Sequence, residues 1–421
     1  MSYAVDLQCI NCGKNYALIP MFEGCPACRT QHFTSNLVVN YDLERLREEG
    51  VENLCNDRPF LWKWNKLLPV NHETNIVSLG EGETPLIPFK NSGDFFGIDR
   101  VFIKDESRNP TWSHKDRMCS VLISKAVEFG AKVIAVSSTG NHGASAAAYA
   151  ARAGLDCVIF TVSYTTSTML TFMQAYGAKV VALPTSQDRW RLLKQCVKEL
   201  GWFTTSSYIT PPLGNNPYGT DGYKTIAYEI WLQMDRRVPD IIIDPVSYAS
   251  TLFGIWKGFS ELKELGLIDK VPRMVAAERF GSLENAIRND LQFIEPVKTE
   301  ETIAISIAVS SSGFYGLKSI RESSGMAVSV NDGEIISMQE ALGKKGMFYE
   351  ASSVASASAL KKLVAKGDIH KDDSVVLIMT SSGLKDPSPI REMIPEVPVI
   401  RPHLTALGDT LRQIYNFAID R

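Results

Sequence analysis

Four cysteines near the start of the chain have the spacing of a metal site. They form two C-x-x-C pairs, Cys9 with Cys12 and Cys25 with Cys28. Each pair makes a tight turn in which two thiolates can face one ion, and four sulfur ligands suit tetrahedral Zn²⁺ in a closed structural site. A redox C-x-x-C needs only one pair. We therefore expect structural zinc, with a redox pair or a ribbon that has lost its metal as the alternatives.

A second candidate for chemistry is Lys115, in the segment Asn109–Arg117. A lysine that forms a Schiff base must be neutral when it attacks, and partial burial beside an aromatic or apolar wall favours the neutral amine. Trp112 and His114 can supply that wall. The alternative is a solvated Lys-Asp-Arg at the start of a helix, and the local sequence fits both interpretations.

The segment Ser137–Ser145 combines hydroxyls, glycines and an asparagine directly after a short apolar run. Free backbone N–H groups at the start of a helix make a nest for an anion, and an α-carboxylate fits such a nest. The side chain of Asn141 can also donate to a phenolate oxygen on a pyridine ring. A plain N-cap with turn glycines is the alternative, but the run of polar residues and glycines is longer than capping needs.

A third segment of unusual composition, Thr380–Asp386, also follows an apolar run. A hydroxyl at Thr380 can hydrogen-bond a pyridine nitrogen without protonating it. The ring then remains a moderate electron sink, which suits chemistry at a β- or γ-carbon.

The elements that must position these loops alternate between strand and helix from about residue 100 onward. Apolar runs predict strands over residues 133–138, 157–162, 180–183, 240–246, 273–277 and 374–380. Helices are predicted over 143–152, 167–176, 224–234 and 251–265, with another opening at Ser186. This alternation predicts βαβ units and parallel sheets, in which ligands bind at the carboxyl ends of strands. The predicted fold class is α/β.

Length and composition set the expected domain organisation. A chain of 421 residues with 45% hydrophobic content is too large for one core. We expect a zinc ribbon at 1–38, an N-terminal arm with part of the large domain at 39–100, a small α/β domain at 101–210 and a large α/β domain at 211–421. The Pro-, Gly- and Asn-rich stretch Pro211–Gly222 is predicted to be a linker or hinge. Residues 405–419 have helical periodicity.

Composition also limits the classes of binding partner that we expect. Charged residues make up 22% of the chain and the net charge is −3, so neither nucleic acid nor a membrane surface is an expected partner. Apolar runs are far shorter than the ~20 residues that span a bilayer, and the N-terminus lacks a secretory layout. Cysteine pairs in a large chain suggest metal rather than disulfides. We expect a soluble, cytoplasmic protein that acts on a small molecule.

Several motifs stand in the order found in one enzyme family. They are Ser78–Leu86, Asn109–Thr111 with Lys115–Arg117, Ser138–Gly143, Asn216–Tyr218, Asp221–Glu229 and Gly383–Pro387. With these motifs the sequence resembles the threonine synthase-like branch of the fold-type II pyridoxal 5'-phosphate (PLP) enzymes, the superfamily of tryptophan synthase β. The resemblance covers nearly the whole chain, and many members of that branch also carry the N-terminal ribbon.

The resemblance implies two doubly wound parallel-sheet domains and PLP held as a Schiff base on Lys115, which shuttles protons once released. It implies that Asn141 holds the ring oxygen of the cofactor and that Thr380 faces the pyridine nitrogen. The substrate carboxylate would be bound by Ser138, Thr139, Gly140, Asn141 and His142. The cofactor phosphate would lie in the loop of Ser247, Tyr248, Ala249, Ser250 and Thr251. An amino-acid substrate and a homodimer are implied as well.

Two departures from the family pattern bear on cofactor and substrate. The family's phosphate loop is rich in glycine, whereas Ser247–Thr251 contains none, so hydroxyls and the following helix start must replace backbone donors. Threonine synthases place a phosphate-binding arginine shortly after Asn-Pro, and this chain has Gly219 there. Because a bidentate arginine is a strong anchor, we hypothesise that O-phosphohomoserine is not the natural substrate.

A third departure is His142, which gives the Gly-Asn-His-Gly sequence typical of ammonia-lyases. It is either an acid or base for a leaving group or a packing residue of the carboxylate loop. The expected function is elimination or replacement at Cβ or Cγ of an amino acid, with ammonia-lyase or dehydratase chemistry as one alternative. A non-catalytic paralogue with a binding role is the other alternative, and the glycine-free loop is its best support.

Overall fold

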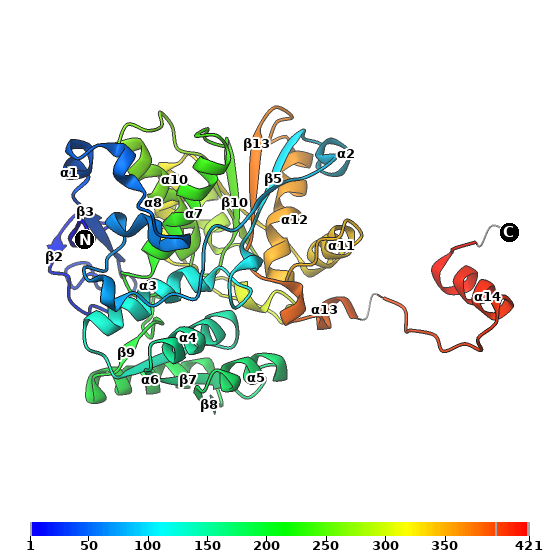
Figure 1. The fold of residues 1–421 in the computed structure, drawn as a ribbon, viewed down its shortest axis with the longest axis horizontal. Helices are drawn as coiled ribbons and strands as arrows, with labels where there is room; N and C mark the ends of the chain where they lie inside the picture. Colours follow the sequence, from blue (N-terminus) through cyan, green and yellow to red (C-terminus); the bar gives the residue numbers. More distant parts are fainter. Residues whose placement is uncertain (1, 392–393, 419–421) are drawn as a thin grey trace.

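The computed structural model describes residues 2–391 and 394–418, which form three sheets surrounded by helices (Figure 1). Two of the sheets consist mainly of parallel strands joined by helices. The predicted α/β class with parallel sheets is therefore confirmed. Among the described residues, no helix is both long enough and apolar enough to cross a membrane.

The larger sheet has six strands in the order β12-β11-β10-β13-β5-β4. Its strands are β4 (Leu86–Pro88), β5 (Arg100–Asp105), β10 (Ile241–Pro245), β11 (Arg273–Glu278), β12 (Met326–Ser329) and β13 (Ser374–Met379). All pair in parallel except β4, which runs antiparallel to β5. The central strand β10 is buried throughout, because helices cover both faces of a parallel sheet.

Helices cover the two faces of this sheet in two groups. On one face lie α7 (Thr220–Gln233), α8 (Ser250–Glu264) and α10 (Phe314–Glu322), and on the other lie α11 (Asp332–Gly343) and α12 (Ala351–Lys366). The short helices α2 (Ser92–Phe96) and α9 (Ser282–Arg288) lie at its margins. Helices α7 and α8 pack backbone to backbone, because a Cβ at Gly258 would lie 2.5 Å from the Lys224 carbonyl oxygen.

The smaller sheet has four parallel strands in the order β8-β7-β6-β9. They are β6 (Val133–Ser137), β7 (Asp156–Val162), β8 (Lys179–Leu183) and β9 (Phe203–Thr204). The helices around it are α3 (Lys115–Glu128), α4 (Asn141–Arg152), α5 (Ser167–Ala175) and α6 (Ser186–Leu200). The alanines of α4 are small enough for α3 and β6 to share one core with it.

The N-terminal ribbon is a three-stranded antiparallel sheet of β1 (Ala4–Cys9), β2 (Asn15–Tyr16) and β3 (Leu37–Tyr41), followed by α1 (Leu43–Glu48). Leu7 and Val39 are paired across it and are fully buried in the same core cluster as Ile134 of β6. The hydroxyl of Tyr41 donates to Asp221 of α7 at 2.8 Å. The ribbon is thus packed on both α/β halves.

The predicted linker over Pro211–Gly222 is partly wrong. Helix α7 begins at Thr220, four residues before the predicted start, and Asn216 and Tyr218 are buried. Gly222 lies inside the helix because α7 packs directly on the backbone of α3: a Cβ at Gly222 would lie 2.2 Å from the Arg117 carbonyl oxygen. The glycine serves close packing rather than a hinge.

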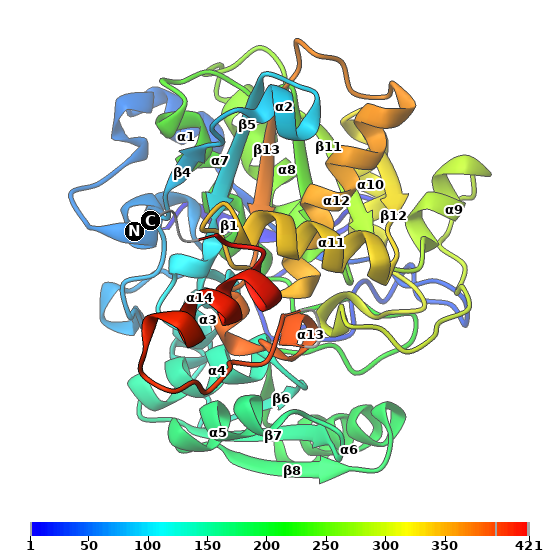
Figure 2. The same ribbon diagram turned by 90° about the vertical axis from the view of Figure 1, so that its right-hand side faces the viewer.

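Helices α13 (Ser388–Arg391) and α14 (Leu404–Tyr415) end the described chain. Helix α14 has no buried residue and lies apart from the α/β body in Figure 1; Figure 2 views the molecule from that side. The helical periodicity predicted from residue 405 is confirmed as far as Tyr415, and Ile419 lies outside the described residues.

Candidate active site

The predicted site residues come from four loops that follow parallel strands. Lys115 is the first residue of α3, Asn141 is the first residue of α4, Thr380 directly follows β13, and Ser247–Thr251 joins β10 to α8. The structure brings these loops together through a chain of side-chain contacts. It therefore places the lysine at the carboxyl ends of the strands, where α/β folds bind ligands.

The amine of Lys115 contacts two side chains. Its Nζ lies 3.0 Å from Nε2 of His114 and 3.2 Å from the hydroxyl of Tyr223. The other ring nitrogen of His114, Nδ1, lies 3.0 Å from the carbonyl oxygen of Thr380. A carbonyl can only accept, so we assign the proton to Nδ1, which leaves the lone pair of Nε2 facing the lysine.

Both partners of Lys115 are uncharged near neutral pH. Burial lowers the pKa of His114 well below its usual value, and burial raises the pKa of Tyr223 well above its usual value. Burial also lowers the pKa of Lys115 to about 8. A substantial fraction of this amine is neutral at mildly alkaline pH, as a Schiff-base lysine requires.

Asn141 is held between two segments of the larger domain. Its Nδ2 donates to Oε2 of Glu350 at 2.7 Å, and its Oδ1 accepts from the Ser381 hydroxyl at 3.3 Å. The remaining oxygen of Glu350 accepts from Ser306 at 2.5 Å. These contacts fix the amide at the junction of the two sheets. The charge of Glu350 also acts on Lys115, so Glu350 belongs to the site although the sequence did not single it out.

The start of α4 is organised by Ser138. Its hydroxyl accepts from the backbone N–H of Gly143 at 2.9 Å and from that of Gly140 at 3.2 Å. In this conformation the Ser138 hydroxyl acts as a cap, as the plainer interpretation expected. His142 contacts the hydroxyl of Thr205 at 2.9 Å, and burial together with the charge of Lys115 lowers its pKa to about 3. Its imidazole is therefore neutral at pH 7.

The hydroxyl of Thr380 lies 2.8 Å from that of Ser353, the third residue of α12. The Ser353 hydroxyl also accepts from the backbone N–H of Ser381 at 2.9 Å. Thr380 is buried, and its hydroxyl is held by the hydroxyl of Ser353. Such a neutral hydroxyl can orient a ring nitrogen without supplying a charge.

The glycine-free loop Ser247–Thr251 keeps a turn that glycine would favour. Ala249 has φ 58°, in the left-handed region, and immediately precedes α8. The backbone of Ser247 is anchored by the Ser312 hydroxyl at 2.7 Å. The fifteen-residue helix α8 begins within this loop, which carries hydroxyls in place of glycines. This geometry fits a phosphate group.

A side chain at Gly219 would require neighbouring side chains to move. A Cβ built there would lie 2.7 Å from Nδ2 of Asn215, 2.9 Å from Cγ of Met118 and 3.0 Å from Cδ1 of Leu122. The space that an arginine stem would need is occupied by these neighbours. A larger residue at this position would therefore disturb the packing of Asn215, Met118 and Leu122.

Two further buried polar residues act on the lysine, Tyr223 by direct contact and Asp244 through its charge. Tyr223 of α7 is fully buried and touches Nζ of Lys115. Asp244 of β10 is also fully buried, and neither of its carboxylate oxygens has a hydrogen-bond partner among the described residues. The sequence did carry a signal for Asp244, a lone carboxylate at the end of the apolar run Ile241–Ile243.

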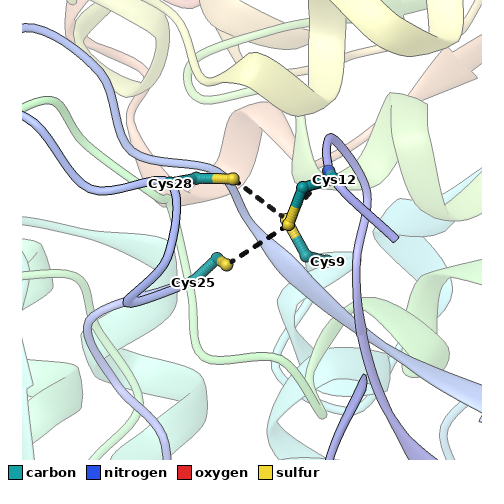
Figure 3. Close-up of side chains that lie close together, drawn as sticks. All are labelled: Cys9, Cys12, Cys25 and Cys28. Atoms are coloured by element: carbon teal, nitrogen blue, oxygen red, sulfur yellow. Dashed lines mark hydrogen bonds between the residues drawn. The ribbon is translucent and has the colours of Figure 1, made fainter. Parts of the chain in front are cut away.

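The four cysteines of the ribbon lie within one small cluster. Figure 3 shows their side chains converging from two turns. The Sγ atoms of Cys9 and Cys28 are 3.7 Å apart, those of Cys12 and Cys25 are 3.8 Å apart, and all four lie within 4.8 Å of one another. Four thiolates placed tetrahedrally at ~2.3 Å from one ion have sulfur–sulfur separations of about 3.8 Å. The cluster thus fits a four-sulfur site.

Comparison with known proteins agrees with this geometry. Residues 77–381 match the family described as "Pyridoxal-phosphate dependent enzyme". The threonine synthase of Methanocaldococcus jannaschii is 36% identical over 388 residues, which cover 90% of this chain and 93% of that protein. The threonine synthase of Methanosarcina acetivorans is 35% identical over 414 residues, 96% of this chain and 98% of that protein.

Solved structures share the fold at lower identity. A pyridoxal 5'-phosphate-dependent aspartate racemase matches with a TM-score of 0.63 and 22% identity over 73% of this chain and 92% of that chain. A threonine deaminase of Solanum lycopersicum matches with a TM-score of 0.63 and 19% identity, covering 76% and 88%. The diaminopropionate ammonia lyase of Escherichia coli matches with a TM-score of 0.63 and 16% identity, over 78% of this chain and 94% of that chain.

The half-buried Lys115 follows a strand of a mainly parallel sheet in an α/β fold. The chain belongs to the pyridoxal-phosphate dependent enzyme family and is related to threonine synthases.

Proposed function

We propose that this chain is a PLP-dependent lyase or synthase that eliminates or replaces a group at Cβ or Cγ of an amino-acid substrate. The observation that carries the proposal is the amine of Lys115, held between His114 and Tyr223 with a lowered pKa. The family relationship supports PLP as the cofactor. Elimination and replacement share the same requirement for a lysine that moves a proton.

The chain has residues suited to each part of the cofactor. In this proposal Asn141 holds the ring oxygen, Thr380 faces the ring nitrogen, and Ser247–Thr251 with the start of α8 holds the phosphate. When bound, PLP supplies an electron sink conjugated to the substrate's α-carbon. A neutral hydroxyl at Thr380 keeps that sink moderate, which favours β- and γ-chemistry.

The remaining roles fall to groups of this chain. Backbone and hydroxyl groups of Ser138–His142 bind the substrate carboxylate at the start of α4. The Lys115 amine takes the proton from the α-carbon, and Nε2 of His114 accepts a hydrogen bond from that amine and orients it. The neutral imidazole of His142 packs on Thr205. It does not enter the reaction as an imidazolium.

Absorption spectroscopy tests this proposal. The purified protein with added PLP should show a visible band that is lost in Lys115→Ala, while Lys385→Ala, another buried lysine near the site, should keep it. A screen of amino acids should then perturb the band, and the product of the responding substrate distinguishes elimination from replacement. Ammonia or a keto acid would favour the ammonia-lyase alternative. A wild-type protein that gives no band with PLP would favour a non-catalytic paralogue.

We propose further that O-phosphohomoserine is not the natural substrate. Support comes from Gly219, where Asn215, Met118 and Leu122 fill the space that a phosphate-binding arginine would need. Without a bidentate anchor the substrate phosphate loses its strongest charge-assisted contact. Efficient formation of threonine from O-phosphohomoserine would contradict this proposal.

We also propose that Cys9, Cys12, Cys25 and Cys28 bind one structural Zn²⁺. The sulfur–sulfur distances and the closed, four-sulfur donor set support it. One equivalent of zinc should co-purify with the chain and be lost in Cys12→Ser, whereas Cys196→Ser, a buried cysteine of α6, should retain it. Absence of zinc from protein prepared without chelators would argue for a ribbon without metal.

A further inference from the structure

The cysteine cluster of the ribbon is contacted by side chains to which the proposed zinc site assigns no role. The phenol oxygen of Tyr16, in β2, lies 3.1 Å from Sγ of Cys25. The hydroxyl of Ser35 lies 3.1 Å from Sγ of Cys9 and 3.3 Å from the carbonyl oxygen of Asn36. Because Cys9, Cys25 and Ser35 are buried, hydrogen bonds to these two sulfurs are stronger than they would be in water.

The other two sulfurs have different surroundings. Nδ2 of Asn11 donates to Sγ of the half-buried Cys28 at 3.5 Å. Cys12 is exposed, and its Sγ lies 3.8 Å from that of Cys25. In the part of the chain that the structure describes, no side chain outside the cluster is hydrogen-bonded to the sulfur of Cys12. The cluster is therefore asymmetric, since three sulfurs have a polar side chain in contact and the fourth has none.

A bound metal would fix the direction of these hydrogen bonds. A thiolate that binds Zn²⁺ has lost its proton and can only accept, so Tyr16, Ser35 and Asn11 must donate. Four thiolates carry more negative charge than one Zn²⁺ balances. Among the described residues, no lysine or arginine is hydrogen-bonded to a sulfur of the cluster. The excess negative charge is therefore spread over neutral donors.

We propose that Tyr16, Ser35 and Asn11 are positioning residues of the zinc site, each donating to one metal-bound thiolate, and that the metal is released from the side of Cys12. A hydrogen bond of this kind favours the thiolate over the thiol and holds the sulfur in place for the metal. Tyr16 has the largest share, because a phenol is more acidic than an aliphatic hydroxyl and Ser35 is also in contact with a carbonyl oxygen. This inference rests on the proposed zinc site.

The first test is the zinc affinity of the full-length chain, measured by competition with a chromogenic chelator. Tyr16→Phe keeps the ring and should weaken zinc binding by about tenfold or more, as is usual when a group that orients a metal ligand is lost. Ser35→Ala should weaken it by a smaller factor. Thr34→Val is the matched control and should bind zinc like the wild type, because the buried hydroxyl of Thr34 has no hydrogen-bond partner among the described residues.

Cobalt substitution separates a hydrogen bond to sulfur from a role in packing. Co²⁺ bound by thiolates shows sulfur-to-metal charge-transfer bands. Without its hydrogen bond the thiolate of Cys25 gives up electron density more easily, so the band of Tyr16→Phe should move to longer wavelength, while that of Thr34→Val stays in place. If Tyr16→Phe does not fold, Ser35→Ala carries the same prediction for Cys9. A loss of affinity without a shift of the band would identify packing residues and would overturn the inference.

Alkylation of the zinc-loaded chain, mapped by mass spectrometry, tests the route of release. It should begin at Cys12, and modification that begins at Cys25 would contradict the inference. Variants that bind zinc as tightly as an intact wild-type site would refute the inference alone. A wild type that binds neither zinc nor cobalt would instead refute the proposed zinc site, and the inference with it.

Discussion

Two cations of α3, the buried Arg117 and the half-buried Lys115, lie two residues apart and have opposite surroundings. Arg117 is fully buried and donates hydrogen bonds to two carboxylates. Glu106 accepts from it at 2.7 and 2.8 Å, and Glu229 accepts from it at 2.6 and 2.7 Å. These carboxylates raise the pKa of Arg117 above its ordinary value. In the part of the chain that the structure describes, Lys115 has the neutral hydrogen-bond partners His114 and Tyr223, and burial lowers its pKa to about 8.

The difference shows how one helix supports both stability and reactivity. The ion cluster is completed by Lys104, which donates to Glu229 at 2.6 Å, so that two cations face two carboxylates. Every charge in it has a partner, and the cluster ties α3 to α7 and β5. Two residues away on the same helix, the reactive amine has no hydrogen bond to a carboxylate among the described residues, which favours the loss of its proton.

The largest expected effect separates the two cations directly. Arg117→Met should unfold or strongly destabilise the protein, since it leaves two buried carboxylates without their main cation, at a cost of roughly 3–5 kcal/mol. Lys115→Met should retain most of the free energy of unfolding while losing covalent attachment of PLP. Denaturant unfolding of both variants checks this, and equal destabilisation would erase the distinction.

A smaller effect is expected at the carboxylate side of the cluster. Glu229→Gln keeps the shape but removes one of two charges that balance Arg117 and Lys104, so the free energy of unfolding should fall by about 1–3 kcal/mol. The matched change at the reactive lysine, Tyr223→Phe, should cost less, because Tyr223 carries no charge. Chemical denaturation at pH 7 compares the two, and a larger loss for Tyr223→Phe would contradict the comparison.

The pH dependence of stability should distinguish Asp244 from the paired carboxylates. Its pKa is raised by burial to about 8 in the folded chain, above the ordinary ~3.9 of an unfolded aspartate. A raised carboxyl pKa means that the folded state holds its proton more tightly, so stability is present at acidic pH and is lost as pH rises towards 8. Asp244→Asn removes this loss.

The measurement is the difference in Tm between Asp244→Asn and the wild type from pH 5 to pH 9. We expect the Tm of Asp244→Asn to rise relative to the Tm of the wild type as the pH increases. The contribution of Glu229 to stability depends on pH in the opposite direction. Burial would raise its pKa, but Arg117 and Lys104 lower it to about 2, so this contribution is lost at acidic pH. A flat difference for Asp244→Asn would indicate that the carboxyl is not protonated in the folded chain.

The smallest effect concerns the phosphate loop. Ala249 has φ 58°, a conformation that an alanine adopts at a cost of about 1 kcal/mol relative to glycine. Ala249→Gly should therefore stabilise the chain by a few tenths to 1 kcal/mol and should leave or slightly tighten PLP binding. Ala355→Gly, in the interior of α12, should destabilise it. Thermal unfolding with and without PLP checks both changes.

Much of the fold was predictable because its signals are local. The apolar run at 133–138 and the alanine-rich helix after it match β6 and α4 within two residues. The start of α7 was not predictable. Gly222 signals a turn in the sequence, whereas in the structure it allows close contact with the Arg117 backbone. Such close helix packing is a property of the tertiary fold and has no local signature.

The site shows the same division. Lys115, Asn141 and Thr380 were found because each lies in a strand-end loop of unusual composition. Tyr223 and Glu350 were missed because each sits at the start of a helix whose placement against Lys115 and Asn141 depends on long-range packing. The roles of the predicted residues towards cofactor and substrate remain predictions that the experiments above address.

The most direct test of the central claim is to trap the lysine that carries the cofactor. The protein incubated with PLP would be reduced with borohydride, digested and mapped by mass spectrometry. We predict one phosphopyridoxyl group per chain, on Lys115, with attachment that accelerates as pH approaches 8 and the amine becomes neutral. A label on another lysine, or no label on the intact chain, would contradict the account.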